Sequence, residues 1–481
     1  MQEPVIVFCK DRSAAWLICR LLRWRQVYSL SLPFDTPLET LMAHHPKGII
    51  ISAPPDEPGA MDGLDSRILD SGLPVLALGG IAAALCIREG GQVSPMLYST
   101  TPIPLTLIDH PLFQGMDQGG GVLLMLAPLH PAGNMLPIAA AGEDIIGCMA
   151  ADMPLYALEY PIERNDPDAA QLLTNFAYEI CKCRADWNED TKIGQALAVI
   201  REGVPADGQV LCAISGGVDS AVCAKLASMA LGDRLSCIFV DTGLFRQGEV
   251  QNVISEAQES LGLPVACVDA RESFLKALAD IDGADAKEKA ASRLMRRTLT
   301  DHLHRHPELC GLMMGTNYSD VLYNDADADP MELKVTILEP IRHLFKDEVR
   351  RLATALGLPE SVANRQSFPS SGLALRIYGK VTEKRLNLLR AADSFLQEEI
   401  LEARLDKKLW QYYATLIQSP DAPGCYTICL RAIQASQGQG LAARLPFDLM
   451  ERATARILAE IPDVSRVVYD LTPSKRYSMP E

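Results

Sequence analysis

One short segment carries the residues whose types and spacing point most directly to chemistry. It reads Ser-Gly-Gly-Val-Asp-Ser over residues 215–220 and follows an apolar run at 210–214. Two glycines let a backbone approach an anion closely, and a helix that begins here offers unpaired N–H groups and a positive dipole end. The hydroxyls of Ser215 and Ser220 add hydrogen-bond donors, and Asp219 could hold Mg²⁺ or cap the helix. The segment therefore predicts a phosphate-binding loop.

The alternative interpretation is a plain strand-to-helix turn, in which glycine permits the bend and serine or aspartate only caps the helix. No Gly-Lys-Ser or Gly-Lys-Thr ending follows, so the segment is not the usual kinase or GTPase loop. A predicted strand before the six residues and a predicted helix at 220–231 after them supply the context that phosphate loops require. We therefore favour the phosphate-binding interpretation.

Alternating strands and helices from residue 192 onward predict the sheet that carries this loop. Strands separated by helices imply right-handed crossovers and a doubly wound parallel sheet, with ligands at the carboxyl ends of the strands. The predicted strands are 210–214, 235–240, 264–268 and 309–314, and the predicted helices are 193–201, 220–231, 249–261 and 272–278.

The two ends of the chain have different patterns. Continuous apolar runs near the start suit strands buried on both faces of a parallel sheet, and they alternate with helical segments and a Pro- and Gly-rich meander. These runs are 5–8, 48–51 and 73–78, the helices are 13–23 and 169–183, and the meander is 92–150. After residue 379, a helix at 382–405 and strands at 426–430 and 464–469 predict a compact α+β domain. We expect an α/β protein with domains at 1–190, 191–378 and 379–481.

Composition limits the class of protein. The 481 residues include 61 acidic and 45 basic side chains, a net charge of −16, and 48% are hydrophobic. Such a chain fits about three globular domains, and its acidity disfavours bulk nucleic-acid binding, which needs a Lys and Arg footprint. The longest uncharged apolar stretch, 73–87, is shorter than the ~20 residues of a membrane helix.

Cysteine usage indicates a reducing compartment. The thirteen cysteines are an odd number scattered mostly through apolar runs, which predicts buried, reduced thiols in a cytoplasmic protein. Cys181 and Cys183 are separated by one residue, closer than the usual two to four of a zinc site, and no histidine lies between His130 and His302. We therefore do not expect a metal site at this pair.

Several further segments occur in the order found in one enzyme family. The 215–220 loop resembles the pyrophosphate loop of ATP pyrophosphatases, and its surroundings resemble GMP synthase. The segment 239–246 resembles that family's second nucleotide-binding strand and turn, and 315–321 resembles its Gly-Thr-x-Tyr-x-Asp-Val segment. The remaining matches are Leu338-Glu339-Pro340, 344–350 and, in the family's C-terminal dimerisation domain, 445–448 and 465–470. The resemblance spans essentially the whole chain.

The resemblance implies a reaction and a set of residues. In that family the loop binds ATP and Mg²⁺ while a carbonyl oxygen of the purine base of XMP attacks the α-phosphorus of ATP. Pyrophosphate leaves in this step, and ammonia then displaces AMP from the adenylated base. By resemblance, Asp219 and Lys346 are catalytic, and Asp219 also holds the metal. The implied ATP contacts are Ser215, Gly216, Gly217, Val218, Asp219, Ser220, Asp241, Gly243, Arg246, Gly315, Thr316 and Asp320, and the implied acceptor contacts are Arg466 and Lys475.

A homodimer is likewise implied by the resemblance alone. Lys346 and Arg350 stand one helical turn apart and could contact phosphate. A solvated helix face with internal ion pairs explains the same residues, and both interpretations stay open.

The first domain keeps the outline of the family's glutaminase but lacks its catalytic residues. Gly79 stands where the nucleophilic cysteine belongs, and Cys86 lies about two helical turns further on. The family's His-Pro-Glu reads Pro161-Ile162-Glu163, and its oxyanion segment reads Ser52-Ala53-Pro54-Pro55. Since proline has no N–H to donate, an oxyanion donor is missing as well. We expect a glutaminase fold without glutaminase activity.

The acceptor site also departs from the family. The segment 366–373 lacks the family's His-Pro-Phe-Pro-Gly-Pro-Gly-Leu, the acidic run 324–329 replaces a His-containing lid, and the tail 473–481 differs. The leading interpretation is an ATP-dependent, AMP-forming ligase that acts on a purine-like carbonyl with ammonia, either free or handed over by a partner protein. The alternatives are a sulfur-inserting enzyme, with Cys212, Cys237 or Cys310 as candidate carriers, and a non-catalytic nucleotide-binding regulator.

Overall fold

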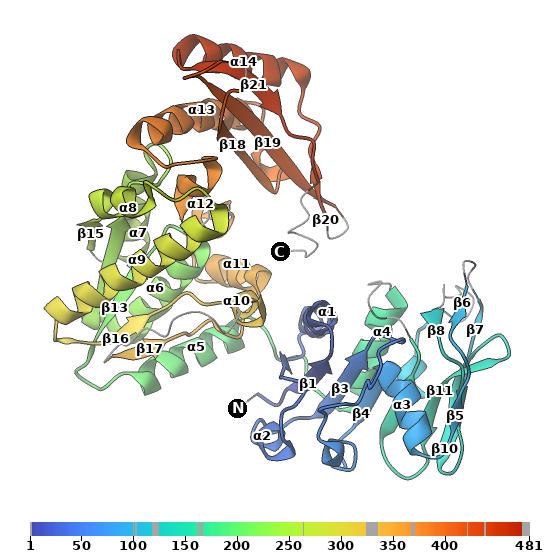
Figure 1. The fold of residues 1–481 in the computed structure, drawn as a ribbon. Coiled ribbons are helices and arrows are strands. Elements are labelled where there is room, and N and C mark those ends of the chain that lie inside the picture. Colours follow the sequence, from blue (N-terminus) through green and yellow to red (C-terminus); the bar gives the residue numbers. More distant parts are fainter. Residues whose placement is uncertain are drawn as a thin grey trace. The chain divides into compact units, whose positions relative to one another are not determined.

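The computed structural model describes residues 2–99, 101, 103–117, 125–160, 162, 167–262, 264–323, 335–366, 371–420, 422–436 and 439–473. The chain divides into two compact units, Met1–Thr191 and Lys192–Glu481, which Figure 1 draws and which are described separately below. The predicted boundary at residue 379 falls inside the second unit and stays a prediction.

The first unit is built on a mixed eight-stranded sheet. Its strand order is β2-β1-β3-β4-β12-β11-β10-β7, with the first five strands parallel and the last three antiparallel. The strands are β1 (Val5–Cys9), β2 (Ser29–Ser31), β3 (Gly48–Ala53), β4 (Val75–Gly79), β7 (Leu105–Leu107), β10 (Met135–Ala141), β11 (Asp144–Ala150) and β12 (Leu155–Leu158).

The three apolar runs predicted as strands form β1, β3 and β4. Every residue of β3 and β4 is buried, as expected for strands in the interior of a parallel sheet. The helices of this unit are α1 (Arg12–Trp24), α2 (Leu38–Met42), α3 (Gly80–Arg88) and α4 (Pro167–Asn175). Asp11 caps α1, since its carboxylate accepts a 3.0 Å hydrogen bond from the N–H of Ala14.

The second unit contains the sheet that the β/α alternation predicts. Its order is β15-β14-β13-β16-β17 and all neighbours are parallel, which confirms the prediction of an α/β fold with a parallel sheet. The strands are β13 (Gln209–Ile214), β14 (Leu235–Asp241), β15 (Val265–Asp269), β16 (Leu309–Met313) and β17 (Thr336–Leu338). Because β14 and β16 flank β13 on opposite sides, the end of β13 is a topological switch point, where such sheets bind ligands.

Eight helices of the described residues accompany this sheet. They are α5 (Glu189–Gly203), α6 (Val218–Leu231), α7 (Glu249–Leu261), α8 (Arg271–Leu278), α9 (Ala284–Arg305), α10 (Tyr318–Tyr323), α11 (Lys346–Ala355) and α12 (Glu360–Ala363).

The last hundred residues add a second, smaller sheet to this unit. In it β19 (Tyr426–Ser436) pairs with β18 (Gln411–Gln418), β20 (Gln439–Ala442) and β21 (Val464–Tyr469), and the helices α13 (Glu383–Glu402) and α14 (Phe447–Glu460) accompany it. One apolar cluster contains buried residues of both sheets, for example Leu211 and Ile238 from one and Ile428 and Leu430 from the other. The two sheets of this unit therefore share a core.

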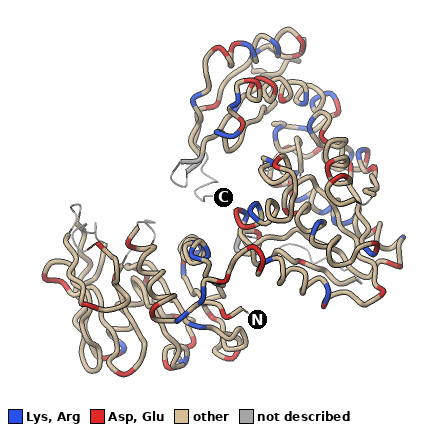
Figure 2. The backbone as a smooth tube through the Cα atoms, turned by 180° about the vertical axis from the view of Figure 1, so that it is seen from behind, with Lys and Arg blue, Asp and Glu red and all other residues tan. Residues whose placement is uncertain are grey.

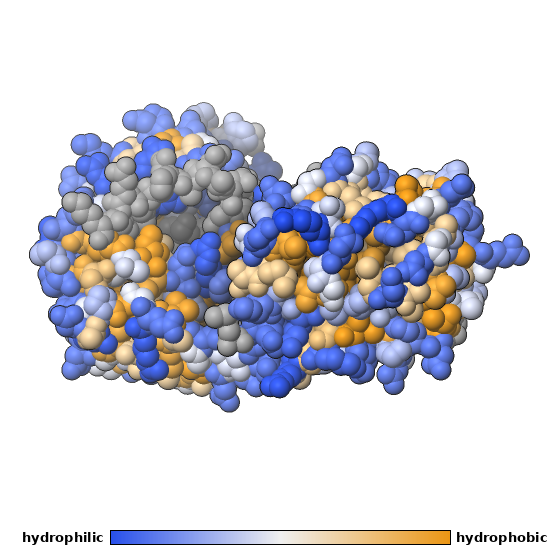
Figure 3. All heavy atoms as spheres, turned by 90° about the horizontal axis from the view of Figure 1, so that it is seen from below, coloured by the Kyte–Doolittle hydropathy of each residue, from blue (hydrophilic) through white to orange (hydrophobic). Residues whose placement is uncertain are grey.

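The surface carries mixed charge. Lys and Arg positions are interspersed with Asp and Glu along both units (Figure 2). The face drawn in Figure 3 is largely hydrophilic, with apolar residues in smaller clusters. Among the described residues, no helix combines the length and apolar character that crossing a membrane requires.

A buried lysine joins α9 to the segment that leads into the smaller sheet. Lys287 is 1% exposed, and its ammonium donates hydrogen bonds to the carbonyl oxygens of Ile377 and Gly379, both at 2.6 Å, and of Ala374 at 3.4 Å. Burial lowers the pKa of Lys287. The helix α9 was not predicted from the sequence, because nine of its 22 residues are charged and one of its few buried positions is a lysine, which the hydrophobic pattern counts as polar.

Replacing Lys287 with methionine should lower the free energy of unfolding by about 2 kcal/mol, because it leaves three buried carbonyl groups without a charged donor. Lys289→Met is the matched control, since Lys289 is exposed on the same helix. Urea unfolding followed by circular dichroism measures both variants. Equal unfolding midpoints for the two variants would contradict the anchoring role.

Candidate active site

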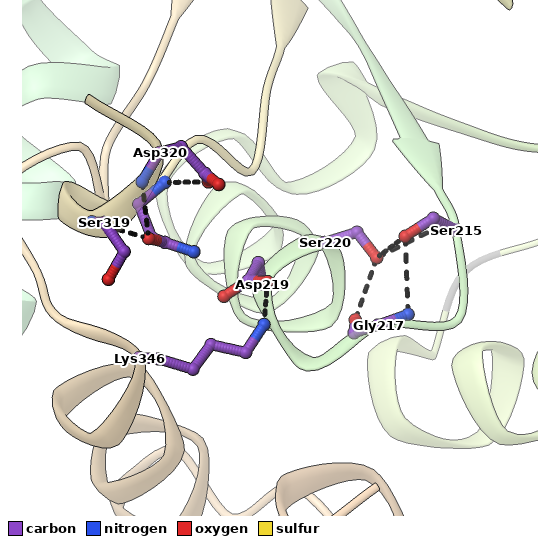
Figure 4. Close-up of polar contacts among 8 residues, drawn as sticks. Ser215, Gly217, Asp219, Ser220, Ser319, Asp320 and Lys346 are labelled. Atoms are coloured by element: carbon purple, nitrogen blue, oxygen red, sulfur yellow. Dashed lines mark hydrogen bonds and ion pairs between the residues drawn. The ribbon is translucent and has the colours of Figure 1, made fainter. Parts of the chain in front are cut away.

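The predicted phosphate loop is a hydrogen-bonded turn between β13 and α6. The hydroxyl of Ser220 donates to the carbonyl oxygen of Gly217 at 2.9 Å and accepts from the N–H of Ser215 at 3.1 Å. The N–H of Gly217 donates to the hydroxyl of Ser215 at 3.3 Å. Figure 4 shows these contacts, which close the turn with its own hydroxyl groups. Since α6 begins at Val218, the N–H groups of its first turn have no acceptor within the helix and are available to an anion.

Gly216 has a backbone conformation that other residues rarely adopt. Its φ angle is +85°, and a Cβ there would lie 2.8 Å from a methyl carbon of Val253 in α7. Glycine is therefore needed for both the backbone shape and the packing of the loop.

Asp219 brings three elements of the second unit together. Its carboxylate pairs with the ammonium of Lys346, the first residue of α11, and Figure 4 shows this lysine extending toward it. A Cβ added to Gly315, just after β16, would lie 3.2 Å from the Asp219 backbone, so this glycine permits the close approach. The oxygen Oδ1 of Asp219 is buried and has no hydrogen-bond partner among the described residues. Lys346 therefore lies at the loop and pairs outside its own helix, and its role in phosphate binding stays a prediction.

A buried ion pair holds the start of α11. Glu348 caps this helix, since its Oε2 accepts a 2.9 Å hydrogen bond from the N–H of Phe345. Its Oε1 lies 3.4 Å from Nζ of Lys192 in α5, and the two side chains are 1% and 2% exposed. Lys192 therefore supports the helix end from which Lys346 extends. Lys192 could not be identified from the sequence, because one lysine inside a predicted helix forms no functional pattern.

The neighbouring strand ends place other predicted residues at the same edge of the sheet. At the end of β14, Asp241 accepts a 2.9 Å hydrogen bond from the N–H of Gly243, whose φ angle is +72°. At the end of β16, Gly315 and Thr316 lead into α10, where Asp320 accepts a 3.0 Å hydrogen bond from the N–H of Asn317. The ends of β13, β14 and β16 thus converge, as neighbouring parallel strands predict.

Arg246 lies in a network with the C-terminal part of the second unit. Its guanidinium pairs with Asp393 of α13 at 3.0 Å and donates to Gln366 at 3.3 Å. Asp393 is 1% exposed, pairs with Arg376 at 3.5 Å and accepts a 2.8 Å hydrogen bond from the N–H of Ala414 in β18. Arg246 therefore connects the β14 turn to α13, a structural task in addition to the predicted ATP contact.

A cavity of about 1050 Å³ opens beside this turn. Asp241, Gly243 and Arg246 line it together with Asp269, Arg271, Lys276 and Arg390. Its lining carries four basic side chains, Arg246, Arg271, Lys276 and Arg390, and four acidic ones, Asp241, Asp269, Glu272 and Glu383. The cavity therefore places charged groups of both signs at the predicted nucleotide-binding turn.

Asp219 and Asp320 provide carboxylates that fit Mg²⁺. Magnesium commonly binds through one or two carboxylates and completes its coordination with phosphate oxygens and water. The unpaired Oδ1 of Asp219 is a free ligand of this kind, and Figure 4 shows Asp320 beside it. Burial raises the pKa of Asp320, and the nearby Asp219 carboxylate adds to the rise.

Arg365 is a loop-contacting residue that the sequence analysis missed. Its guanidinium donates a 2.8 Å hydrogen bond to the carbonyl oxygen of Gly216 and pairs with Glu256 of α7. The only feature of the sequence that pointed to Arg365 was its position directly before the segment 366–373, where the family has its His-Pro-Phe-Pro-Gly-Pro-Gly-Leu motif.

Of the two predicted acceptor contacts, the structure describes Arg466, which it does not bring to the loop. Arg466 is exposed on β21, in a different sheet from the loop. Lys475, the acidic run 324–329 and residues 367–370 and 474–481 lie outside the described residues.

In the first unit, a tight strand-to-helix turn lies at the position where the resemblance predicts a glutaminase nucleophile, and its backbone leaves no room for a side chain. Gly79 ends β4 just before α3, with φ +58° and ψ −131°. A Cβ at Gly79 would lie 2.4 Å from the carbonyl oxygen of Ala53, its neighbour on β3, and a Cβ at Gly80 would lie 2.4 Å from that of Pro54. Pro161 and Glu163 lie outside the described residues.

Comparison with known proteins shows the family of the chain. A family model described as NAD synthase matches residues 195–420, and one described as GMP synthase C terminal domain matches residues 398–478. The "GMP synthase [glutamine-hydrolyzing]" of Carboxydothermus hydrogenoformans is 34% identical over 505 residues, 98% of each chain. That of Thermomicrobium roseum is 34% identical over 504 residues, 98% of this chain and 95% of its own.

Among solved structures, an NMN synthetase from Francisella tularensis is 20% identical, with a TM-score of 0.32 over 39% of this chain and 78% of its own. A TM-score this low supports no further conclusion.

The phosphate loop, its sheet and the family matches make the protein an ATP-dependent ligase of the pyrophosphatase type. The identity and coverage of the relatives are specific enough to go further: the chain belongs to the GMP synthase family.

Removing either partner of the Asp219–Lys346 pair should reduce acceptor-dependent pyrophosphate release from ATP by about 100-fold, because both groups lie at the predicted phosphate loop, where we expect them to stabilise developing charge. The variants are Asp219→Asn and Lys346→Met, and a coupled pyrophosphate assay measures the rate. Arg351→Met is the control, since Arg351 pairs with Asp347 on the exposed face of the same helix. Wild-type rates in both site variants would exclude the assigned roles.

Lys192→Met should lower the free energy of unfolding by about 3 kcal/mol, because it removes the positive charge beside the buried Glu348. The same variant should release pyrophosphate more slowly, since the start of α11 loses its support. Lys192→Arg keeps the charge and should recover most of the rate. A stable Lys192→Met enzyme with full activity would show that the pair is dispensable.

Proposed function

We propose that the second unit adenylates a carbonyl oxygen of a purine nucleotide, XMP or an analogue, with ATP, so that ammonia can replace that oxygen. The observation that carries the proposal is the Asp219–Lys346 pair at the first turn of α6, within the phosphate loop. Membership of the GMP synthase family supports the same reaction.

The residues of the loop suggest how the first step proceeds. The acceptor oxygen attacks the α-phosphorus of ATP, the bond to the β-phosphate oxygen breaks, and pyrophosphate leaves. The N–H groups at the start of α6 and the ammonium of Lys346 are positioned to stabilise the negative charge on the leaving pyrophosphate. Arg365 holds the carbonyl group of Gly216, so the loop keeps its shape while charge moves.

In the second step ammonia attacks the adenylated carbon and AMP departs with the former carbonyl oxygen. An amide-like oxygen is a poor leaving group, and its attachment to AMP makes it easy to expel. Asp219 and Asp320 are the residues proposed to hold Mg²⁺, which when bound supplies charge neutralisation to the phosphates. The remaining predicted ATP contacts at 215–218, 220, 241, 243, 246, 315 and 316 belong to the same proposal.

The first unit is proposed to lack glutaminase activity, so that the nucleophile is free ammonia or ammonia from a partner protein. Two observations support this. A side chain at Gly79 would collide with the Ala53 carbonyl group, and Pro54 and Pro55 have no N–H to donate to an oxyanion. The relatives are named glutamine-hydrolyzing, so this property would separate the chain from them.

Sulfur insertion is less well supported by the cysteines. Cys212 and Cys237 are buried, lie opposite each other on β13 and β14, and burial raises the pKa of both thiols, that of Cys237 to about 11. The sulfur of Cys310 on β16 donates to the carbonyl oxygen of Gln209 at 3.3 Å. The burial and raised pKa values of Cys212 and Cys237 make these two thiols poor nucleophiles, which favours ammonia over sulfur transfer through them.

A homodimer formed by the 379–481 segment is part of the proposal. Exposed apolar side chains on this segment support it, including Phe447 at 69% exposure and Leu471 at 71%. Arg466 and Lys475 stay proposed acceptor contacts in this segment. Light scattering of the purified chain tests the dimer.

Ammonium, and not glutamine, should support the complete reaction. With ATP, Mg²⁺ and XMP, we expect AMP and GMP in equal amounts when ammonium is added, and no glutamate when glutamine is added instead. Chromatography of nucleotides and an enzymatic glutamate assay measure the products. Glutamate release by the purified chain would refute the proposal that the first unit lacks glutaminase activity. A panel of other purine and pyrimidine nucleotides tests the acceptor, and failure of all of them would favour the non-catalytic alternative.

Gly79→Cys should not create glutaminase activity, because its Cβ would fall 2.4 Å from the Ala53 carbonyl oxygen. Glutamate release from glutamine is the measurement, and the ammonium-dependent reaction of the same sample shows that the second unit is intact. Glutamine hydrolysis by this variant would mean that the turn at Gly79 has more room for a side chain than the contacts indicate.

A further inference from the structure

Two cysteines separated by one residue lie at the end of a helical segment in the first unit. After α4 the helix continues as a wider turn, Phe176–Ile180, and Cys181 caps it. The N–H of Cys181 donates to the carbonyl oxygen of Phe176, and that of Cys183 donates to the carbonyl oxygen of Ala177, both at 2.9 Å. Two backbone hydrogen bonds therefore hold both cysteines at this helix end.

Lys182, between them, has a left-handed conformation with φ +54°. A left-handed residue at this place reverses the chain direction as a helix ends. Residues two apart span at most about 7 Å even when fully extended, and a left-handed turn shortens that span. The two Cα atoms are thereby close to the 4.4–6.8 Å separation typical of disulfides.

The two thiols interact, and their surroundings differ. They share a hydrogen bond. Cys181 is 4% exposed and packs against Gly48, where an added Cβ would lie 2.2 Å from its sulfur, whereas Cys183 is partly exposed. The hydrogen bond from Cys181 and the nearby Lys47 ammonium lower the pKa of Cys183, and burial raises that of Cys181. Cys183 is therefore the accessible, more reactive thiol and Cys181 the sheltered one.

A metal site does not explain the pair. Among the described residues, no group of three or more His, Cys, Asp or Glu side chains could hold a metal ion. A second cysteine beside a reactive, partly exposed thiol is instead the arrangement of a redox pair, in which one thiol reacts and the other resolves the product.

We infer that Cys181 and Cys183 form a reversible intramolecular disulfide by exchange with a low-molecular-weight disulfide such as oxidised glutathione. The Cys183 thiolate attacks one sulfur of the small disulfide, forming a mixed disulfide and releasing one thiolate. Cys181 then loses its proton to solvent and attacks the sulfur of Cys183, expelling the second small thiolate. Two protein thiols are oxidised to a disulfide, and one small disulfide is reduced to two thiols.

The test uses the full chain in buffers of defined ratios of reduced to oxidised glutathione. After acid quenching and alkylation of free thiols, peptide mass spectrometry locates the oxidised cysteines. In the wild type we expect a peptide that contains Cys181 and Cys183 joined, lighter by two hydrogens and without glutathione. Reduced Cys181 and Cys183 at ratios that modify Cys267, or glutathione stably attached to Cys183 in the wild type, would overturn the inference.

Two variants separate the roles of the thiols. Cys181→Ser should trap glutathione on Cys183, and Cys183→Ser should leave Cys181 reduced, since the sheltered thiol cannot react first. Cys267→Ser is the control: Cys267 is an exposed, solitary thiol on β15, and its loss should leave the 181–183 disulfide unchanged. The wild-type measurement decides the inference even where a variant does not fold.

Discussion

The packing of the predicted active site depends on Asp219, at the start of α6. Its carboxylate pairs with the ammonium of Lys346, which extends from α11. Gly315, in the turn after β16, packs against the backbone of Asp219. A side chain at Gly315 would push the turn after β16 away from α6, because its Cβ would lie 3.2 Å from the Asp219 backbone. The ion pair is itself supported from a distance, because Lys192 and Glu348 hold the helix end that carries Lys346.

Much of this arrangement could be predicted from the chain alone, because the governing patterns are local. The six loop residues, the apolar strand before them and the regular β/α alternation identify a phosphate loop and a parallel sheet. Parallel neighbours then bring Asp241 and Gly315 to the same edge as the loop, although 74 residues separate them in the sequence.

The residues that could not be predicted are those whose role depends on a partner distant in the sequence. Lys192, Lys287 and Arg365 read as ordinary surface charges until their acceptors are known, and each proves to bind a specific backbone group or buried carboxylate. The helix α9 was missed for the same reason, because its buried face includes a lysine. Arg466 illustrates the opposite case: resemblance suggested a role, and its place on a separate sheet leaves that role untested by the geometry.

The tight packing at Gly79 has a consequence for any attempt to build a nucleophile at this position. The carbonyl oxygens of Ala53 and Pro54 occupy the volume that a Cβ at Gly79 or Gly80 would need. Ala53 ends β3, every residue of which is buried, so a new side chain would have to displace a buried strand end. A single substitution at Gly79 therefore meets a steric cost, and a larger residue there requires coordinated changes in β3 and β4.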